Sequence, residues 1–194
     1  MALAGNPNAG KTTLFNRLTG ARQHVGNYPG ITVDYKEGSI DHLEHHIVLT
    51  DLPGTYSMTA YSAEELVSRD HLVNERPHVV INIVDASNLE RNLYLTCQLL
   101  ELGAPVVVAL NMIDVAKSRG MEVKAEVLEK LLQVPVVPII ARSGFGKKEL
   151  LDACIEVAIG DTVWEPKDIS YGDDLDTTLQ ELTEKIYETS FLLD

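Results

Sequence analysis

Short runs of apolar, mostly β-branched residues recur along the chain at 79–84, 106–110 and 136–140. Runs of this length without polar alternation are typical of strands that are buried on both faces of a parallel sheet. A further apolar run at 1–4 predicts a strand at the start of the chain. Apolar and polar residues alternate at 39–50 around a histidine-rich turn, which predicts a β-hairpin.

Segments with the helical spacing of apolar residues lie between these runs. They cover 11–19, 63–74, 89–102, 124–132 and 147–158. Strands that alternate with helices predict right-handed crossovers and an α/β fold, in which helices flank an open, mostly parallel sheet. In such a sheet the ligand lies beyond the carboxyl ends of the strands.

The character of the sequence changes after residue 160. Residues 161–174 resemble a linker, and apolar residues then recur at helical spacing on an acidic helix, at Leu175, Leu179, Leu182 and Ile186. We therefore expect one domain at 1–160, with 161–194 forming a linker and the incomplete start of a small helical unit.

Composition narrows the classes of protein that remain. The chain has 194 residues, 45% of them hydrophobic, and a net charge of -13, which argues against binding to nucleic acid. It contains neither a run of 18 apolar residues nor a signal peptide, so we expect a soluble domain that faces the cytosol. Cys97 and Cys154 lie within apolar helical patterns, which favours buried thiols over a disulfide.

The chemistry begins with the stretch GNPNAGKTT. Its pattern, G-x-x-x-x-G-K-[ST], is that of a phosphate-binding loop, in which backbone N–H groups surround the phosphates of a nucleotide. Lys11 would reach the β- and γ-phosphates, and the Thr12 hydroxyl would bind Mg²⁺. The alternative is a plain turn before a helix. The expected contact residues are Gly5, Asn6, Pro7, Asn8, Ala9, Gly10, Lys11, Thr12 and Thr13.

Two later segments have the features of a nucleotide switch. Asp51 opens DLPG after a strand and can hold Mg²⁺ through water, and the Gly54 N–H can contact a γ-phosphate. The Gly- and Pro-rich stretch 26–38 predicts a mobile loop that runs into a strand. Within it Thr32, beside Gly30 and Ile31, is the natural second hydroxyl ligand of Mg²⁺. Each segment alone could be a plain turn or strand.

The base is predicted by NMID, at 111–114, which follows an apolar strand. The Asp114 carboxylate can accept both N–H groups on one edge of guanine, a pair that adenine lacks, while Asn111 would brace the adjacent loops. Met112 would cover the base, and the backbone N–H groups of Ala141 and Arg142 can reach the guanine carbonyl. Because these segments follow strands in the order that a guanine-nucleotide switch requires, the sequence predicts a GTPase of the Ras-like class.

Three longer passages carry a more specific resemblance. GNYPGITVDYKEG, DLPGTYSMTAYSAEE and NIVDASNLERNLYLTCQLLELG resemble the ferrous iron transport protein B family over residues 1 to about 159. The resemblance implies a G domain with a helical spacer, joined in the full-length polypeptide to a membrane domain at the cytoplasmic face of the inner membrane. It also implies a GTP-hydrolysing switch for Fe²⁺ uptake, with GTP or GDP and Mg²⁺ as cofactors. Whether the domain forms a homo-oligomer stays open.

Several positions depart from the common GTPase pattern. Thr55 stands where efficient enzymes often place a Gln that positions water, so we expect slow intrinsic hydrolysis. Lys11, Thr32 and Gly54 then remain as catalytic candidates. Asn8 resembles the residue with which some GTPases recruit K⁺ beside the phosphates, although an Asx turn explains it equally well.

The base site departs as well. Met112 replaces a common Lys and Ile140 a common Ser, which predicts weak GDP affinity and fast release.

Three alternatives accompany this interpretation. The histidines at 42, 45 and 46 could bind a metal, but a solvated turn is the better interpretation of their spacing. The chain could also be a free-standing soluble GTPase of ribosome or tRNA maturation. Such proteins usually carry a basic RNA-binding module, which this acidic chain lacks. The chain could finally be a regulator that binds a nucleotide without hydrolysing it, and such a protein would release no phosphate.

Overall fold

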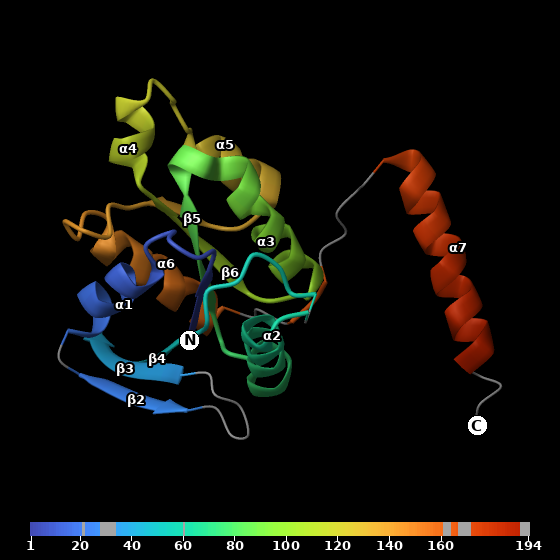
Figure 1. The fold of residues 1–194 in the computed structure, drawn as a ribbon, viewed down its shortest axis with the longest axis horizontal. Coiled ribbons are helices and arrows are strands. Elements are labelled where there is room, and N and C mark those ends of the chain that lie inside the picture. The colour runs from blue at the N-terminus through green and yellow to red at the C-terminus, as the bar shows by residue number, and fades with distance from the viewer. Residues whose placement is uncertain (21, 28–33, 60, 161–163, 167–171, 191–194) are drawn as a thin grey trace.

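A seven-stranded sheet forms the centre of the protein (Figure 1). The computed structural model describes residues 1–20, 22–27, 34–59, 61–160, 164–166 and 172–190. The strand order is β2-β3-β4-β1-β5-β6-β7. The strands are β1 (Ala2–Gly5), β2 (Gln23–Asn27), β3 (Asp34–His42), β4 (His45–Asp51), β5 (Val80–Asp85), β6 (Val106–Asn111) and β7 (Val136–Pro138).

The sheet is parallel except at one edge. Strand β1 pairs in parallel with β4 and β5, and β6 pairs in parallel with β5 and β7. Strands β2, β3 and β4 form an antiparallel meander. The mostly parallel α/β sheet expected from the apolar runs is therefore confirmed.

Helices cover both faces of the sheet. They are α1 (Lys11–Thr19), α2 (Ala63–Glu75), α3 (Leu89–Glu101), α4 (Ile113–Ser118), α5 (Ala125–Leu132), α6 (Lys147–Ile159) and α7 (Asp173–Ser190), with a 3-10 turn at Ala86–Asn88. One buried cluster packs α1 and α6 against the sheet, and a second packs α2, α3, α4 and α5 on the other face (Figure 1). Neighbouring residues of β5 and β6 alternate between the clusters, as the period of a strand requires.

Three elements differ from the expectation. Strand β7 ends at Pro138 rather than at Ile140, and as an edge strand it is buried only at Val136. Gly26 and Asn27 belong to strand β2, and β3 already begins at Asp34, although this stretch was expected to form a loop running into a strand. Strand β2 is an edge strand that pairs through its backbone with β3, so it shows no apolar alternation. Helix α4 is six residues long, too short to show a helical period.

The carboxyl-terminal part contains the expected helix, α7. Its apolar residues Leu175, Leu179, Leu182 and Ile186 are all about half exposed or more, and α7 lies apart from the sheet (Figure 1). Trp164, by contrast, packs against the cluster under α3, so packing onto the core extends past residue 160.

Both cysteines are free thiols, with Cys154 fully buried. Burial raises the pKa of Cys154 to about 12, which keeps this thiol protonated at neutral pH. None of the helices in the described ranges is long and apolar enough to span a membrane.

Candidate functional site

The candidate site lies where parallel strands end. The loop after β1 leads into α1, Asp51 is the last residue of β4, and Asn111 is the last residue of β6. Because these strands are parallel neighbours around β1 and β5, their carboxyl ends meet at one edge of the sheet. Segments that are far apart in the sequence therefore form a single site.

Two glycines of the phosphate-binding loop lie where a side chain would not fit. A Cβ on Gly5 would lie 2.3 Å from Ile83 Cγ2, and one on Gly10 would lie 2.4 Å from Asn111 Nδ2. Asn8 and Gly10 have φ angles of 67° and 98°, which turn the backbone sharply just before α1. The loop thus presents the amino-terminal, partly positive end of α1, where anions bind favourably.

Lys11 and Asp51 form a buried ion pair within this site. Lys11 Nζ lies 2.6 Å from Asp51 Oδ1, and the two side chains are only 12% and 5% exposed. Burial raises the pKa of Asp51, and the Lys11 ammonium opposes that shift. The lysine expected to bind phosphates is therefore held at the site by a carboxylate that the same phosphates would repel.

Asn111 connects the phosphate-binding loop with the loop after β7. Its Nδ2 donates to Ala9 O at 2.9 Å, and its Oδ1 accepts from Ala141 N at 2.9 Å. The expected brace between loops is thus present in the geometry. The Ala141 N–H, which was expected to face a base, instead donates to Asn111, so only the Arg142 N–H remains for that role.

A cavity of about 250 Å³ adjoins this bridge. It is bounded by the loop before α1, the start of α4 and the loop after β7. Met112 caps α4 in a left-handed conformation with φ 59°, and exposed Asp114 lies in the first turn of that helix. The lining residues are Gly10, Thr13, Asn111, Met112, Asp114, Val115, Ile140, Ala141 and Arg142. The residues expected to select a base therefore share one cavity.

Gly54 lies against the phosphate-binding loop. A Cβ at Gly54 would be 3.4 Å from Pro7 Cα, and the Thr55 N–H donates to Gly5 O at 3.2 Å. Thr55 is only 3% exposed, and its hydroxyl accepts from Ser57 N at 3.1 Å. The Thr55 side chain is thus engaged with its own turn rather than with the site.

Other expected residues are placed differently. The Asn6 side chain is 3% exposed and donates to Arg91 O of α3 at 3.2 Å, so it faces away from the cavity. Thr12 and Thr13 are exposed at the start of α1. Gly30, Ile31 and Thr32 lie outside the described residues.

Two contacts of this region were not anticipated. Arg91 Cζ lies 4.1 Å from the centre of the Tyr56 ring, and Arg17 Nη2 donates to Arg142 O. In the sequence, the passage that contains Arg91 carries only the family resemblance. Neither pair has a signal in the spacing of the sequence, because the partners are joined only by the fold.

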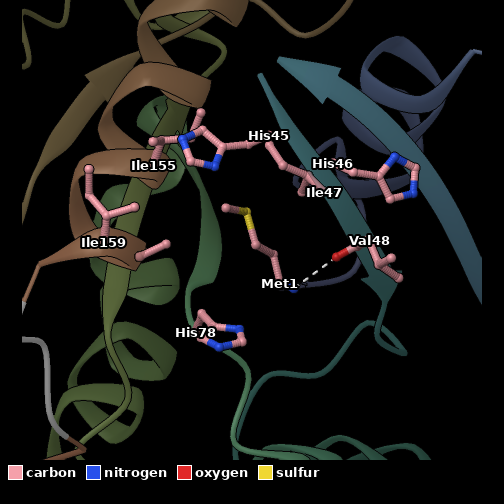
Figure 2. Close-up of a pocket in the computed structure, with 9 residues that line it drawn as sticks. Met1, His45, His46, Ile47, Val48, His78, Ile155 and Ile159 are labelled. Carbon is pink, nitrogen blue, oxygen red and sulfur yellow. Dashed lines mark hydrogen bonds between the residues drawn. The ribbon is translucent and has the colours of Figure 1, made fainter. Parts of the chain in front are cut away.

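The histidines lie at the opposite end of β4 from Asp51. His45, His46 and His78 line a cavity of about 320 Å³ beside Met1 and α6, but Figure 2 shows that their rings do not converge. His46 Nδ1 lies 2.8 Å from Asp41 Oδ1, and His42 Nε2 lies 2.6 Å from Asp152 Oδ1. Among the described residues, no group of three metal-ligating side chains is present.

Comparison with known proteins identifies the same family that the three sequence passages resemble. The family model described as ferrous iron transport protein B matches residues 1–154. The Fe(2+) transport protein A/Fe(2+) transporter FeoB fusion protein of Porphyromonas gingivalis is 49% identical over 188 residues, which are 96% of this chain and 22% of that protein. The chain therefore spans about a fifth of the length of the curated relatives it matches.

Solved structures agree with this result. A mutant S. thermophilus NFeoB bound to GDP has a TM-score of 0.84 and 43% identity, covering 94% of this chain and 70% of that one. The cytosolic domain of the T. maritima FeoB iron transporter in its GMPPNP form has a TM-score of 0.85 and 40% identity, covering 93% and 71%. The fold is thus that of a P-loop GTPase domain.

The two hydrogen bonds of the Asn111 side chain lead to a prediction about the free energy of unfolding. Asn111→Ala removes two buried hydrogen bonds and leaves Ala9 O and Ala141 N unpaired, which should lower the free energy of unfolding by about 2–4 kcal/mol. Asn88→Ala is the matched control, because Asn88 is exposed and its side chain makes no capping bond; it should cost about 0.5 kcal/mol or less. Urea denaturation measures both, and equal losses would contradict the bridge.

Proposed function

The chain belongs to the ferrous iron transport protein B family, and we propose that it is the GTP-binding and GTP-hydrolysing switch domain of a membrane ferrous iron uptake transporter. The observation that carries the proposal is the cavity in which the phosphate-binding loop, the start of α4 and the loop after β7 meet. The membrane domain would belong to the same full-length polypeptide, and the present domain would work at the cytoplasmic face of the inner membrane.

Guanine nucleotide is the proposed ligand. The S. thermophilus relative is bound to GDP and the T. maritima relative is in a GMPPNP form. The match to each covers more than 90% of this chain. Asp114 is exposed at the cavity, where its carboxylate can accept two N–H groups from guanine. Met112 lines the same cavity and can cover the base with its flexible apolar side chain.

Mg²⁺ is the proposed metal, and the donor set fits it. Thr12 offers an exposed hydroxyl at the start of α1, and Asp51 offers a desolvated carboxylate whose raised pKa reflects the lack of water around it. Thr12, Asp51 and Thr32 would hold the ion, Asp51 through water. When bound, Mg²⁺ neutralises charge on the phosphates.

The protein's own residues define the hydrolytic step. Lys11 leaves Asp51 and turns to the phosphates, and Gly54 offers its N–H to the γ-phosphate from its place against Pro7. Thr55 cannot orient water because its hydroxyl is bonded to the backbone of Ser57. We therefore propose slow intrinsic hydrolysis, with the γ-phosphate holding the segments around Thr32 and Gly54 in one arrangement.

Asn8 is proposed to bind K⁺ beside the phosphates. Asn8 is exposed and has a φ of 67°, and its side chain makes no hydrogen bond to another described residue. The side-chain carbonyl at this point of the loop is available to a cation, which would take the place of the stabilising arginine that the switch segments lack.

Replacement of Asp114 tests the nucleotide proposal. Asp114→Ala removes two charge-assisted hydrogen bonds to guanine and should weaken GTP binding by about 100-fold or more. Asp70→Ala on α2 is the matched control, because Asp70 is also exposed but lies outside the cavity, and this variant should bind GTP like the wild type. Titration calorimetry with GTP and ATP measures both variants, and equal binding by the two would reject the assignment.

Titration calorimetry with GDP tests the expectation that the protein binds GDP weakly and releases it quickly. Because Met112 and Ile140 provide fewer fixed polar contacts than the common Lys and Ser, GDP should dissociate quickly. A nanomolar Kd for GDP would contradict that expectation. Phosphate release from GTP separates a GTPase from a regulator that only binds nucleotide.

Potassium dependence tests the role of Asn8. The rate of phosphate release by the wild type should rise by about tenfold or more when KCl replaces NaCl, since a positive charge at the phosphates stabilises the transition state. Asn8→Ala should lose this difference while still binding GTP. Equal wild-type rates in the two salts would exclude K⁺ stimulation.

The transporter proposal is tested in cells of the source organism. An antibody raised to this chain should detect a membrane-bound band several times larger than 21.4 kDa. Cells carrying Asp114→Ala in that protein should take up Fe²⁺ more slowly than cells carrying Asp70→Ala. A soluble band near 21.4 kDa would instead indicate a free-standing GTPase.

A further inference from the structure

Helix α3 contacts two separate parts of the nucleotide site. The phosphate-binding loop reaches α3 through Asn6, and the segment after Gly54 reaches it through Tyr56 and Met58. The proposed function assigns no role to this helix. The passage 88–95, which contains the first turns of α3, is nevertheless one of the most distinctive parts of the sequence.

The contact with the phosphate-binding loop is buried. Asn6 Nδ2 donates to Arg91 O at 3.2 Å, and the Asn6 residue is 3% exposed. Its Oδ1 is also buried and has no partner among the described residues. Because a buried amide is costly to leave unpaired, this bond fixes the start of the loop relative to α3.

Helix α3 also holds both ends of the short segment 56–58. The Arg91 guanidinium lies over the Tyr56 ring, 4.1 Å from its centre, in the geometry of a cation–π contact. Two turns further along the helix, Gln98 Oε1 accepts from Met58 N at 2.9 Å. The segment is therefore attached to one face of α3 at two points.

The start of α3 is itself anchored to the sheet. Asn92 Oδ1 accepts from Asp85 N at 3.2 Å and its Nδ2 donates to Asn88 O at 2.8 Å. One turn later Thr96 Oγ1 donates to Asn82 Oδ1 of β5 at 2.6 Å, with both residues fully buried. Arg91 thus projects from a helix that is anchored to the sheet.

Gly54 lies between these attachments. It packs against Pro7 on one side, and the next residue but one, Tyr56, is held by Arg91 on the other. We propose that Arg91 is a positioning residue for GTP hydrolysis, which acts through the Tyr56 ring to hold the Gly54 N–H toward the γ-phosphate. This inference rests on the proposed function. It also explains how the site can orient backbone groups when the Thr55 hydroxyl is engaged elsewhere.

Steady-state GTP hydrolysis by variants of this chain tests the proposal. Arg91→Ala and Tyr56→Ala should each lower kcat by about two- to fivefold, the effect available to an exposed cation–π contact, with KM unchanged. Tyr56→Phe keeps the ring and should retain wild-type kcat, and Arg91→Lys should fall between the wild type and Arg91→Ala. The double variant should be no slower than either alanine variant, because both remove one interaction.

The matched control is Tyr94→Ala. Tyr94 is an exposed tyrosine on the same helix, 56% accessible, and its loss should leave kcat unchanged. Wild-type kcat in Arg91→Ala, equal loss in Tyr94→Ala, or multiplied losses in the double variant would each overturn the positioning role. These results would leave the proposed function standing as long as the wild type releases phosphate, whereas a wild type without turnover would remove both.

A spectroscopic measurement reports the contact without hydrolysis. The Arg91 side-chain protons should be shifted upfield by the Tyr56 ring in the NMR spectrum of the wild type and of Tyr56→Phe. The shift should disappear in Tyr56→Ala, while a Tyr94→Ala spectrum should keep it. An Arg91 signal that does not respond to Tyr56→Ala would overturn the proposal even if that variant were slow for other reasons.

Discussion

The side-chain amide of Asn111 is the interaction on which the site depends. It joins Ala9, 102 residues away along the chain, to Ala141, 30 residues away, and it does so with one donor and one acceptor in a buried position. Only a side chain that carries both groups can satisfy the two backbone partners at once. Gly10 must stay without a side chain for the same reason, because a Cβ there would lie 2.4 Å from the Asn111 amide.

A second constraint is the pair of opposite charges buried beside the phosphate-binding loop. The Lys11 ammonium and the Asp51 carboxylate are both largely buried, so each would be costly without the other. Their pairing keeps the lysine at the amino-terminal end of α1, where the loop is already shaped by Gly5 and Gly10. The loop backbone is therefore already shaped for an anion, whereas Lys11 would have to exchange its pairing with Asp51 for the phosphates.

Helix α3 gives the distinctive passage at 88–95 a physical explanation. Asn92 and Thr96 fix the helix to β5, whereas Arg91 presents its carbonyl to Asn6 and its guanidinium to Tyr56. The helix therefore forms a common wall for the phosphate-binding loop and for the segment that follows Gly54. Residues that look like ordinary helix surface in the sequence make these contacts because of what lies across from them in the fold.

The sequence by itself determined the buried strands, helix α1 and the phosphate-binding loop. These features depend on local rules, because β-branched runs favour buried strands and the Gly5 and Gly10 positions of the loop have no room for a Cβ. It could not predict β2, whose polar residues are held by backbone pairing with β3, nor the six-residue helix α4. The pairs Lys11–Asp51 and Arg91–Tyr56 were likewise decided only by the tertiary structure. Their partners lie tens of residues apart, and only the order of the strands in the sheet brings them into contact.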